Sequence, residues 1–345
     1  MLLTPQEIKE QTRALWRTAF NDSEDFIDLY FEEKYTDDAN IFFRHDGELF
    51  AAAQVFPMRF QMGGHVLPSV YVSGLATLPQ YRRQGLAAQV LYYAHRRAFE
   101  RGVVFSFLVP GDEKLVNFYR QQMHGNYEVS TCRIRVPFQR TDTASEGIEV
   151  SAPEQYGKEV YVFYKKQQQQ SAVALTLSEN DFFAAVADVE LDNGALLVAR
   201  RRQKIVGTCL YVPTGNGILV RDLMVADPAA QTAFVDYLET AFPKKELQLI
   251  DYCKWAEEGA EPYAMARVLN VERFLTVVAA HHPEETFEVG LEGDEHIPEN
   301  NGFYRLEKGK LKVIAHRPNV VLTPGAFAAA FLREHPVEMR LLMSD

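Results

Sequence analysis

The 345-residue sequence predicts a mixed α/β (α+β) protein with two similar halves and a smaller C-terminal part. An apolar stretch rich in β-branched residues, 70–77, leads through a proline and a glycine-bearing loop into apolar residues at helical spacing. The order strand, proline, helix returns in 218–238. After residue 256 the pattern changes to short strands and hairpins with a helix between them. These observations favour two related domains followed by a third of a different kind.

The first part of the chain reads as two helices followed by strands around a central strand–helix unit. Thr4 can cap the first helix, and Pro5 suits its first turn. Pro79 ends the central strand because proline cannot donate to the ladder. The predicted elements are helices 4–18 and 21–31, strands 40–43, 49–60 and 70–77, helix 85–100, strand 103–109, helix 113–119 and strand 126–137.

The loop before helix 85–100 predicts an anion-binding site. Free backbone N–H groups at a helix start, together with the helix macrodipole, attract negative charge. Gly85 and Ala87 keep side chains away, so a pyrophosphate can reach the backbone, and Arg82 and Arg83 add positive charge at the rim. The alternative is an ordinary strand-to-helix turn with surface arginines.

This stretch resembles motif A of the GNAT acyl-CoA N-acyltransferases, in which Gln/Arg-x-x-Gly-x-Gly/Ala follows a strand. The approach through Pro79-x-Tyr81-Arg82 fits the same pattern. The resemblance implies acetyl-CoA as cosubstrate, a gap between splayed strands that takes the pantetheine arm, and backbone N–H groups that bind the oxyanion. Gly74 is expected to mark a bulge that helps the strands splay. The cofactor-binding residues that the resemblance implies are Leu75, Ala76, Thr77, Arg82, Arg83, Gln84, Gly85, Leu86, Ala87 and Asn117.

A second motif supplies the candidate general acid. Asn117-Phe118-Tyr119-Arg120 resembles the family's Phe-Tyr pair, whose tyrosine protonates the departing thiolate of coenzyme A. The family has a glycine four residues after that tyrosine, whereas this sequence has Met123 there and its first glycine at Gly125. Two extra residues can lengthen the turn before the next strand. The alternative is that Tyr119 is an amphipathic tyrosine packed at a helix end.

The second half looks like a related domain without a cofactor site. A small, polar linker, 141–147, separates the halves, and 223–228 parallels 75–79. The following residues, 229–233, contain neither the arginine nor the glycine. The basic run 200–204 is read as a solvated hairpin tip. The expected domains are a catalytic GNAT domain over 1–140, a degenerate GNAT-like domain over 141–255 and a C-terminal domain over 256–345.

The C-terminal part resembles the sterol-carrier-like domain that closes acetyltransferases of the enhanced-intracellular-survival type. Segments 265–270, 297–302 and 335–339 carry this resemblance, which concerns the fold and gives no evidence for lipid binding. It implies that the terminal carboxylate of Asp345 enters the active site and helps to take the amine proton. Leu341, Leu342 and Met343 could anchor that end. The alternative is a terminus that only packs.

Composition limits the classes of binding partner and the cellular compartment that we expect for this protein. A formal net charge of −11 disfavours nucleic acid as a partner, and an acidic surface either attracts cationic amines or only aids solubility. No apolar run approaches the ~20 residues of a membrane span, and no signal peptide is recognisable. The odd, widely spaced cysteines Cys132, Cys209 and Cys253 suit a reducing cytoplasm and argue against disulfides or a zinc site. We expect no metal, since His281-His282 lacks further ligands at zinc spacing.

The sequence thus predicts an acetyl-CoA-dependent N-acetyltransferase. The acetyl group would pass directly to a primary amine of a small cationic molecule or peptide, because no residue spacing suggests a covalent intermediate. Two alternatives remain: an acyl-CoA-binding regulatory protein without acceptor chemistry, and an acyltransferase with another acyl donor or a hydroxyl acceptor. Formation of a homo-oligomer is left open.

Overall fold

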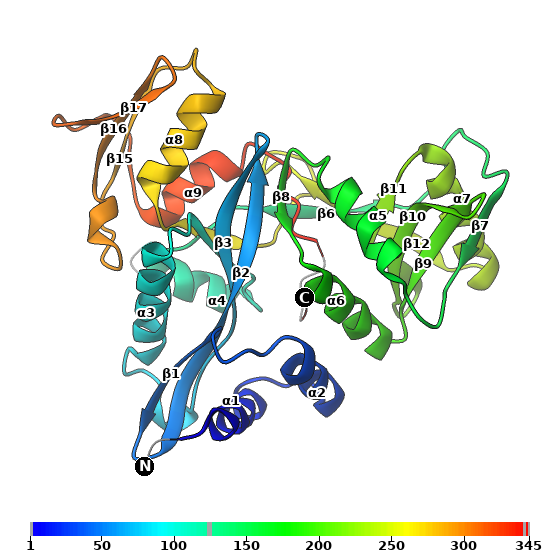
Figure 1. The fold of residues 1–345 in the computed structure, drawn as a ribbon, viewed down its shortest axis with the longest axis horizontal. Helices are drawn as coiled ribbons and strands as arrows, with labels where there is room; N and C mark the ends of the chain where they lie inside the picture. Colours follow the sequence, from blue (N-terminus) through cyan, green and yellow to red (C-terminus); the bar gives the residue numbers. More distant parts are fainter. Residues whose placement is uncertain (1–2, 123–125, 341–342, 344–345) are drawn as a thin grey trace.

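The structure is a computed structural model that describes residues 3–122, 126–340 and 343, and it contains three β-sheets with helices packed against them (Figure 1). The helices are α1 (Pro5–Ala19), α2 (Glu24–Glu33), α3 (Leu86–Glu100), α4 (Glu113–Asn117), α5 (Lys158–Gln168), α6 (Glu179–Leu191), α7 (Pro228–Ala241), α8 (Val271–His281) and α9 (Pro324–Leu332). The 3₁₀ turns are η1 (Pro79–Tyr81) and η3 (Pro298–Asn300), and η2 (Phe118–Gln122) is a π-helical turn. None of the described helices has the length and apolarity that crossing a membrane requires.

The first sheet has the order β1-β2-β3-β4-β14-β5, with β8 paired to β2. Its strands are β1 (Asn40–His45), β2 (Glu48–Met62), β3 (His65–Thr77), β4 (Phe105–Leu108), β5 (Glu128–Val129), β8 (Val173–Thr176) and β14 (Met265–Val268). The long hairpin of β2 and β3 is antiparallel, β3 and β4 are parallel, and β14 is antiparallel to both β4 and β5. This sheet therefore contains strands from all three expected domains, and the division at residues 140 and 255 stays a prediction.

The second sheet has the order β13-β6-β12-β11-β10-β9-β7 and lies on the right in Figure 1. Its strands are β6 (Cys132–Pro137), β7 (Ile148–Ser151), β9 (Ala195–Arg201), β10 (Lys204–Pro213), β11 (Gly217–Val225), β12 (Glu246–Cys253) and β13 (Glu261–Pro262). Leu196 and Val198 of β9 pack in the cluster that contains α5 and α6 side chains, whereas Leu197 packs with Phe234 of α7. Because alternate residues face opposite sides, this sheet is covered on both faces.

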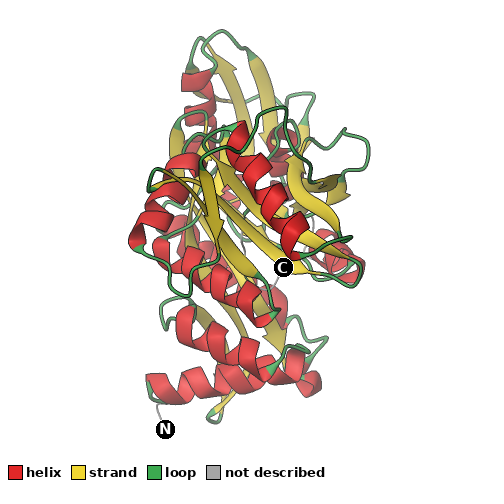
Figure 2. Ribbon diagram, turned by 90° about the vertical axis from the view of Figure 1, so that its right-hand side faces the viewer, coloured by secondary structure: helices red, strands yellow, loops and turns green. Residues whose placement is uncertain are grey.

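The third sheet, β17-β16-β15-β18, packs against α8 and α9. Its strands are β15 (Phe287–Leu291), β16 (Gly302–Glu307), β17 (Lys310–Ile314) and β18 (Val321–Leu322). Phe274 of α8 joins this part to the first sheet, since its ring lies 4.9 Å from that of Phe105 and 5.0 Å from that of Phe331. Seen from the side, α1 and α2 lie at the opposite end of the molecule (Figure 2). The predicted mixed α/β class with mixed, splayed sheets is confirmed.

Local signals explain where several elements begin. Thr4 caps α1 in a capping box with Glu7, and Thr323 caps α9 with Pro324 in its first turn. The predicted single strand 126–137 is wrong, because β5 and β6 belong to different sheets. The chain changes sheets at Ser130 and Thr131, whose backbone N–H groups both donate to the carbonyl of Ala264.

Candidate active site

A groove of about 510 Å³ opens where β3 and β4 separate. The two strands pair from Ser69↔Phe105 to Tyr71↔Phe107, and β3 then continues to Thr77 without β4 beside it. Backbone groups of β3 along this edge are therefore available to a ligand instead of a neighbouring strand. The groove is lined by Ala19, Phe20, Leu75, Ala76, Thr77, Tyr81, Arg82, Arg83, Gly85, Leu86, Ala87, Ala88, Leu115, Phe118 and Tyr119.

The predicted bulge at Gly74 is confirmed, and its cause is a close contact with α1. Ala52 of β2 pairs with Ala76 of β3, and Gln54 pairs with Ser73. An advance of two residues along β2 therefore corresponds to three residues along β3, so β3 carries the extra residue. Gly74 has φ 61°, and a Cβ there would lie 2.2 Å from the Trp16 ring. Only glycine meets both conditions, so Trp16 and Gly74 together bend β3 beside the groove.

The start of α3 forms the other end of the groove. Its N-cap is Gly85 with φ 75°, and no side chain accepts a hydrogen bond from the first N–H groups. These N–H groups thus remain available to an anion. Arg82 is exposed and donates from Nε to the carbonyl of Thr77 at 3.0 Å, which holds its guanidinium near the strand end.

Most of the residues that the resemblance implies for the cofactor meet at this groove. Leu75, Ala76, Thr77, Arg82, Arg83, Gly85, Leu86 and Ala87 all line it. Gln84 and Asn117 are exposed and do not line it. The binding roles of the whole set stay a prediction.

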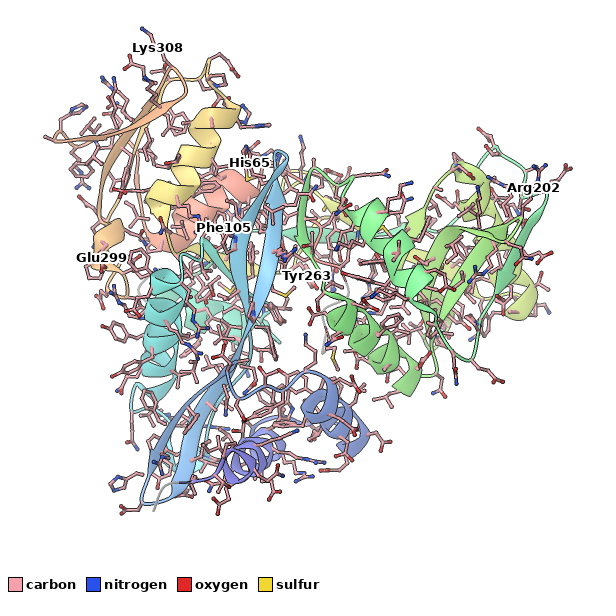
Figure 3. The ribbon with its side chains drawn as sticks, viewed as in Figure 1. His65, Phe105, Arg202, Tyr263, Glu299 and Lys308 are labelled. Atoms are coloured by element: carbon pink, nitrogen blue, oxygen red, sulfur yellow. The ribbon has the colours of Figure 1, made fainter. Side chains whose placement is uncertain are left out.

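The corresponding helix start in the second half is already occupied. The Asp227 carboxylate caps α7 by accepting from the Ala230 N–H at 3.2 Å and pairs with Arg201 at 2.7 Å. The protein thus supplies its own anion where α3 leaves N–H groups open. Arg202 lies at the outer tip of the β9–β10 hairpin, far from the groove (Figure 3).

Tyr119 stands on the groove wall at the end of α4. The helix widens there into the π-helical turn η2, a form that often marks an inserted residue and is frequent at functional sites. Tyr119 is 7% exposed, and burial raises the pKa of its phenol, with a smaller contribution from Tyr127. Its hydroxyl therefore stays protonated at neutral pH, as a general acid requires. The segment with Met123 and Gly125 lies outside the described residues.

A buried polar network lies behind Tyr119. The Tyr127 hydroxyl is hydrogen bonded to Ser106 Oγ at 2.7 Å and to His95 Nε2 at 2.9 Å. His95 Nδ1 is 2.8 Å from His296 Nδ1, and Arg267 bonds Asp294 at 2.7 Å. The network ties α3 and β4 to β14 and the loop before η3. Sequence reasoning missed it, and the only available signal was a histidine among the apolar residues of helix 85–100.

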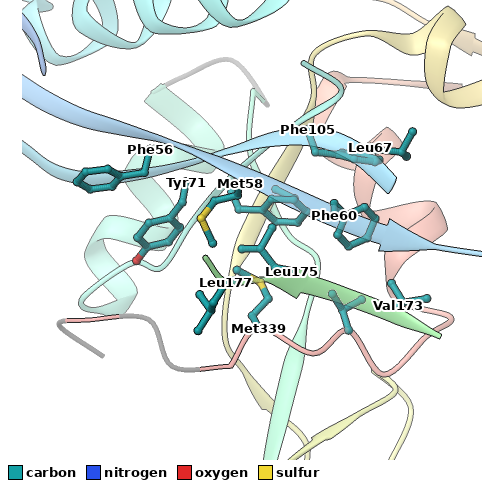
Figure 4. Packing of buried hydrophobic residues seen from close by; sticks show 14 of the residues in the cluster. Phe56, Met58, Phe60, Leu67, Tyr71, Phe105, Val173, Leu175, Leu177 and Met339 are labelled. Atoms are coloured by element: carbon teal, nitrogen blue, oxygen red, sulfur yellow. The ribbon is translucent and has the colours of Figure 1, made fainter. Parts of the chain in front are cut away.

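A second pocket lies on the opposite face of β3. Here the Tyr30 hydroxyl donates to Ser73 Oγ at 3.1 Å. Figure 4 shows Phe56, Met58 and Tyr71 of the β2–β3 hairpin close to Leu177, below the hairpin. We call this cavity the α2–α6 pocket, and it is lined by Tyr30, Lys34, Phe56, Met58, Tyr71, Ser73, Leu177, Asp181 and Met343.

The C-terminal segment runs toward this pocket. Glu338 lies beside β8, with its carbonyl accepting from the Leu175 N–H at 2.8 Å, and Arg340 pairs with the buried Asp222 at 2.7 Å. Met343 is 6% exposed and lines the α2–α6 pocket. Asp345, the predicted catalytic terminus, lies outside the described residues.

His65 and His335 line neither the groove nor the α2–α6 pocket. His65 sits at the tip of the β2–β3 hairpin (Figure 3), and His335 is half-buried, with its pKa lowered by burial and by the charge of Lys254. His124 lies outside the described residues. In the part of the chain that the structure describes, His282, Glu284 and Glu285 bring ligand atoms within 4.8 Å of one another on an exposed turn. Exposed groups of this kind are common without a metal, so the expectation of no metal stays a prediction.

Comparison with known proteins agrees with this geometry. Residues 2–128 match the family model described as an acetyltransferase (GNAT) domain. Eis1 from Mycobacterium abscessus has a similar structure, with a TM-score of 0.72, 14% identity, and coverage of 96% of this chain and 88% of that chain. A probable N-acyltransferase of unknown function from Enterococcus faecalis V583 has a TM-score of 0.71 at 18% identity, covering 94% and 87%. A GCN5-related N-acetyltransferase from Anabaena variabilis ATCC 29413 has a TM-score of 0.68 at 15% identity, covering 95% and 87%.

No curated protein matches this sequence. The three structures named above are below 25% identity, so they establish the shared fold, and the family model establishes the nature of residues 2–128. Residues 2–128 of this chain therefore form an acetyltransferase domain of the GNAT family, and the chain as a whole shares the fold of Eis1.

Proposed function

We propose that this protein transfers an acetyl group from acetyl-CoA directly to a primary amine of a small cationic molecule or peptide. One observation carries the proposal: the open start of α3, the unpaired edge of β3 and the Tyr119 side chain all line one groove. In acetyl-CoA the pyrophosphate, the pantetheine arm and the thioester follow one another, and they would contact these three features in the same order. In the second half, by contrast, Asp227 caps the corresponding helix start.

On the donor side, the pyrophosphate of acetyl-CoA lies at the N–H groups that follow Gly85, near Arg82 and Arg83. The pantetheine arm follows the edge of β3 beyond Tyr71. The thioester carbonyl then meets the backbone N–H groups of 75–77, which stabilise the oxyanion of the tetrahedral intermediate.

The chemical step needs a neutral amine. A lysine-like amine has a pKa of about 10.4, so a group in the site must take its proton before attack. The nitrogen then bonds to the thioester carbon, the C–S bond breaks, and Tyr119 gives its proton to the departing sulfur. Burial of Tyr119, which raises its pKa, supports this role because the phenol keeps its proton until the thiolate forms.

On the acceptor side, the amine enters from the α2–α6 pocket, which lies across β3 from the donor groove. The Asp345 carboxylates help to take the amine proton there, through water. Support comes from Met343, which lines this pocket and is two residues from the end of the sequence. We propose the domain limits 1–140, 141–255 and 256–345, the last being sterol-carrier-like in fold, and a cytoplasmic location. The formal net charge of −11 supports a cationic acceptor and disfavours nucleic acid.

A panel of amines tested with acetyl-CoA separates the proposal from its rivals. Acetylation of at least one amine is expected, with faster turnover than hydrolysis of acetyl-CoA alone. Tight binding of acetyl-CoA without turnover of any amine would instead identify an acyl-CoA-binding regulatory protein. Repeating the panel with longer acyl-CoA donors and with alcohols tests the alternative donor and the hydroxyl acceptor.

A further inference from the structure

The α2–α6 pocket already holds an ammonium group that belongs to the protein. Lys34 caps the C-terminal end of α2, yet its side chain is only 12% exposed. Its ammonium pairs with the Asp181 carboxylate of α6 and lies 4.6 Å from the centroid of the Phe56 ring. A carboxylate and an aromatic face are together a recognition site for an alkylammonium ion.

The pocket is small, and Lys34 is one of the side chains that line it. About 20 Å³ remain between the side chains, less than an acceptor molecule needs. Ser73 of β3 lines the cavity, and Leu75, two residues further on, lines the groove that we assign to acetyl-CoA. The pocket that holds the ammonium and the expected thioester position thus meet one short stretch of β3, where Ser73 accepts a hydrogen bond from Tyr30.

Asp181 also lines a groove that leads from solvent to the α2–α6 pocket. A groove of about 400 Å³ shares Met58, Leu177 and Asp181 with the α2–α6 pocket and continues outward between β2 and α5. A cation arriving through this groove would meet Asp181 before it reached Ser73. Lys34 therefore stands at the junction of the two cavities.

We propose that Asp181 and the Phe56 ring bind one ammonium group of the acceptor, and that Lys34 is a resident cation which the acceptor displaces. This rests on the proposed acetyltransferase function and specifies its acceptor class. The acceptor is an aliphatic diamine, in which one amino group stays charged at Asp181 while the other, a short apolar chain away, reaches the thioester beside Ser73.

The electrostatics support an exchange of cations. Burial alone would raise the pKa of Asp181, but the Lys34 ammonium and hydrogen bonds from Ser178 keep that pKa below its ordinary value. The carboxylate is thus charged and needs a cation whenever Lys34 swings away. The acceptor binds only those molecules in which Lys34 has left Asp181. The apparent affinity is therefore the intrinsic affinity multiplied by the fraction of molecules in this state.

Two substitutions and two substrates test the proposal. The substrates are 1,4-diaminobutane and 1-aminobutane, which share a chain and differ in the second ammonium. Asp181→Asn should lower kcat/KM for the diamine by about tenfold or more, the usual cost of a lost charged hydrogen bond, and leave the monoamine unchanged. Lys34→Met keeps the side-chain stem but removes the competing cation, so it should raise kcat/KM for the diamine alone.

Lys312→Met is the matched control. Lys312 is 56% exposed and pairs with Glu307 at 2.9 Å on the third sheet, so this change removes a lysine–glutamate ion pair without touching the α2–α6 pocket or the groove that leads to it. It should leave kcat/KM for both substrates as in the wild type. Equal responses of the diamine and the monoamine to Asp181→Asn and Lys34→Met would overturn the proposal.

Two further measurements keep the test decisive. Asp181 also closes the capping box of α6 by accepting from the Ser178 backbone N–H at 3.2 Å, so the stability of each variant is compared by urea unfolding. If Asp181→Asn fails to fold, the result for Lys34→Met decides the test. Binding of 1,4-diaminobutane by calorimetry, expected to be tighter in Lys34→Met, reports on the site without turnover. Absence of turnover with every amine would refute the proposed function, whereas unchanged diamine binding in Lys34→Met would refute the inference alone.

Discussion

The Tyr119 ring meets the Tyr127 ring edge-on, with centroids 5.8 Å apart and 67° between their planes. The two tyrosines are both buried but differ in what their hydroxyls do. The Tyr127 hydroxyl is held by Ser106 and His95, whereas no described residue forms a hydrogen bond with the Tyr119 hydroxyl beside the donor groove. The same substitution by phenylalanine at the two positions therefore makes a matched pair: at Tyr119 it tests a role in catalysis, and at Tyr127 it tests a role in stability.

Tyr119→Phe should lower kcat by about ten- to ten-thousand-fold, the range that loss of a general acid commonly costs. Affinity for acetyl-CoA should change little, because the ring still lines the groove. Tyr127→Phe should instead lower the free energy of unfolding by about 1–3 kcal/mol, since it leaves buried polar partners unsatisfied. Steady-state kinetics, calorimetry and urea unfolding separate the two outcomes, and an unchanged kcat in Tyr119→Phe would exclude its role.

Gly85→Glu should abolish binding of acetyl-CoA. A side chain finds no atom within 4 Å there, but the residue has φ 75°, and the new carboxylate would sit at the α3 N–H groups that we assign to the pyrophosphate. Gly64→Glu in the β2–β3 turn is the control, because Gly64 has φ 76° and equally open surroundings away from the groove. Calorimetry should find one site per chain in the wild type and in Gly64→Glu. Binding that survives Gly85→Glu, or two equivalent sites, would contradict the assignment.

Stability should fall as pH decreases through about 6.5, the pKa of an unfolded histidine. His95 is fully buried, and burial, followed by the charges of Arg267 and His296, lowers its pKa well below that value. The unfolded chain therefore gains a proton that the folded chain refuses, and the stability present above pH 6.5 is lost toward acid pH.

Urea unfolding at about pH 7.5 and about pH 5.5 measures this loss. His95→Gln should be less stable than the wild type at the higher pH but lose less on acidification. His45→Gln is the control, since His45 is 79% exposed on a turn and should keep the wild-type pH dependence. An equal loss in His95→Gln and the wild type would refute this account.

Local sequence predicted that the strand end, the Gly85 loop and the start of α3 meet, because these parts are close along the chain. The strand before Thr77, the loop at Gly85 and the start of α3 form one continuous segment, so hydrophobic period and turn chemistry suffice. The pairing of strands could not be predicted in this way. Nothing in the sequence of β14 says that it pairs with β4 and β5, because pairing is decided by packing of remote segments.

The same limit applies to contacts between side chains. Lys34 and Asp181 are 147 positions apart and belong to different helices. Cys132 and Cys253, which sequence spacing sets far apart, are free thiols whose Sγ atoms lie 3.4 Å apart on paired strands. Sequence separation carries no information on such distances, and this is why the cation in the α2–α6 pocket could not be expected.

A buried ion pair anchors the chain at Arg340, three residues before Met343 of the α2–α6 pocket. Arg340 bonds Asp222, which is 3% exposed, and Glu338 at 2.8 Å. Burial raises the pKa of Asp222 and the charge of Arg340 opposes this rise, so Arg340→Met would leave a buried carboxylate without its cation. We expect a loss of about 3–5 kcal/mol in the free energy of unfolding, measured in urea. A loss below 1 kcal/mol, the range of surface pairs, would show that the segment is not anchored in this way.

Removal of Ser344 and Asp345 should lower acetyl transfer to the amine sharply while folding and acetyl-CoA binding survive. An α-carboxylate has a pKa of about 3.5, so it is a weak base, but it can accept a proton through water and hold a cationic acceptor. Appending a few residues after Asp345 moves the charge without deleting it and should have a similar effect. Because Arg340 and Met343 remain in both variants, the buried ion pair and the pocket lining keep their residues. Full activity in both would mean that the terminus only packs, and the proton would then have to leave by another route.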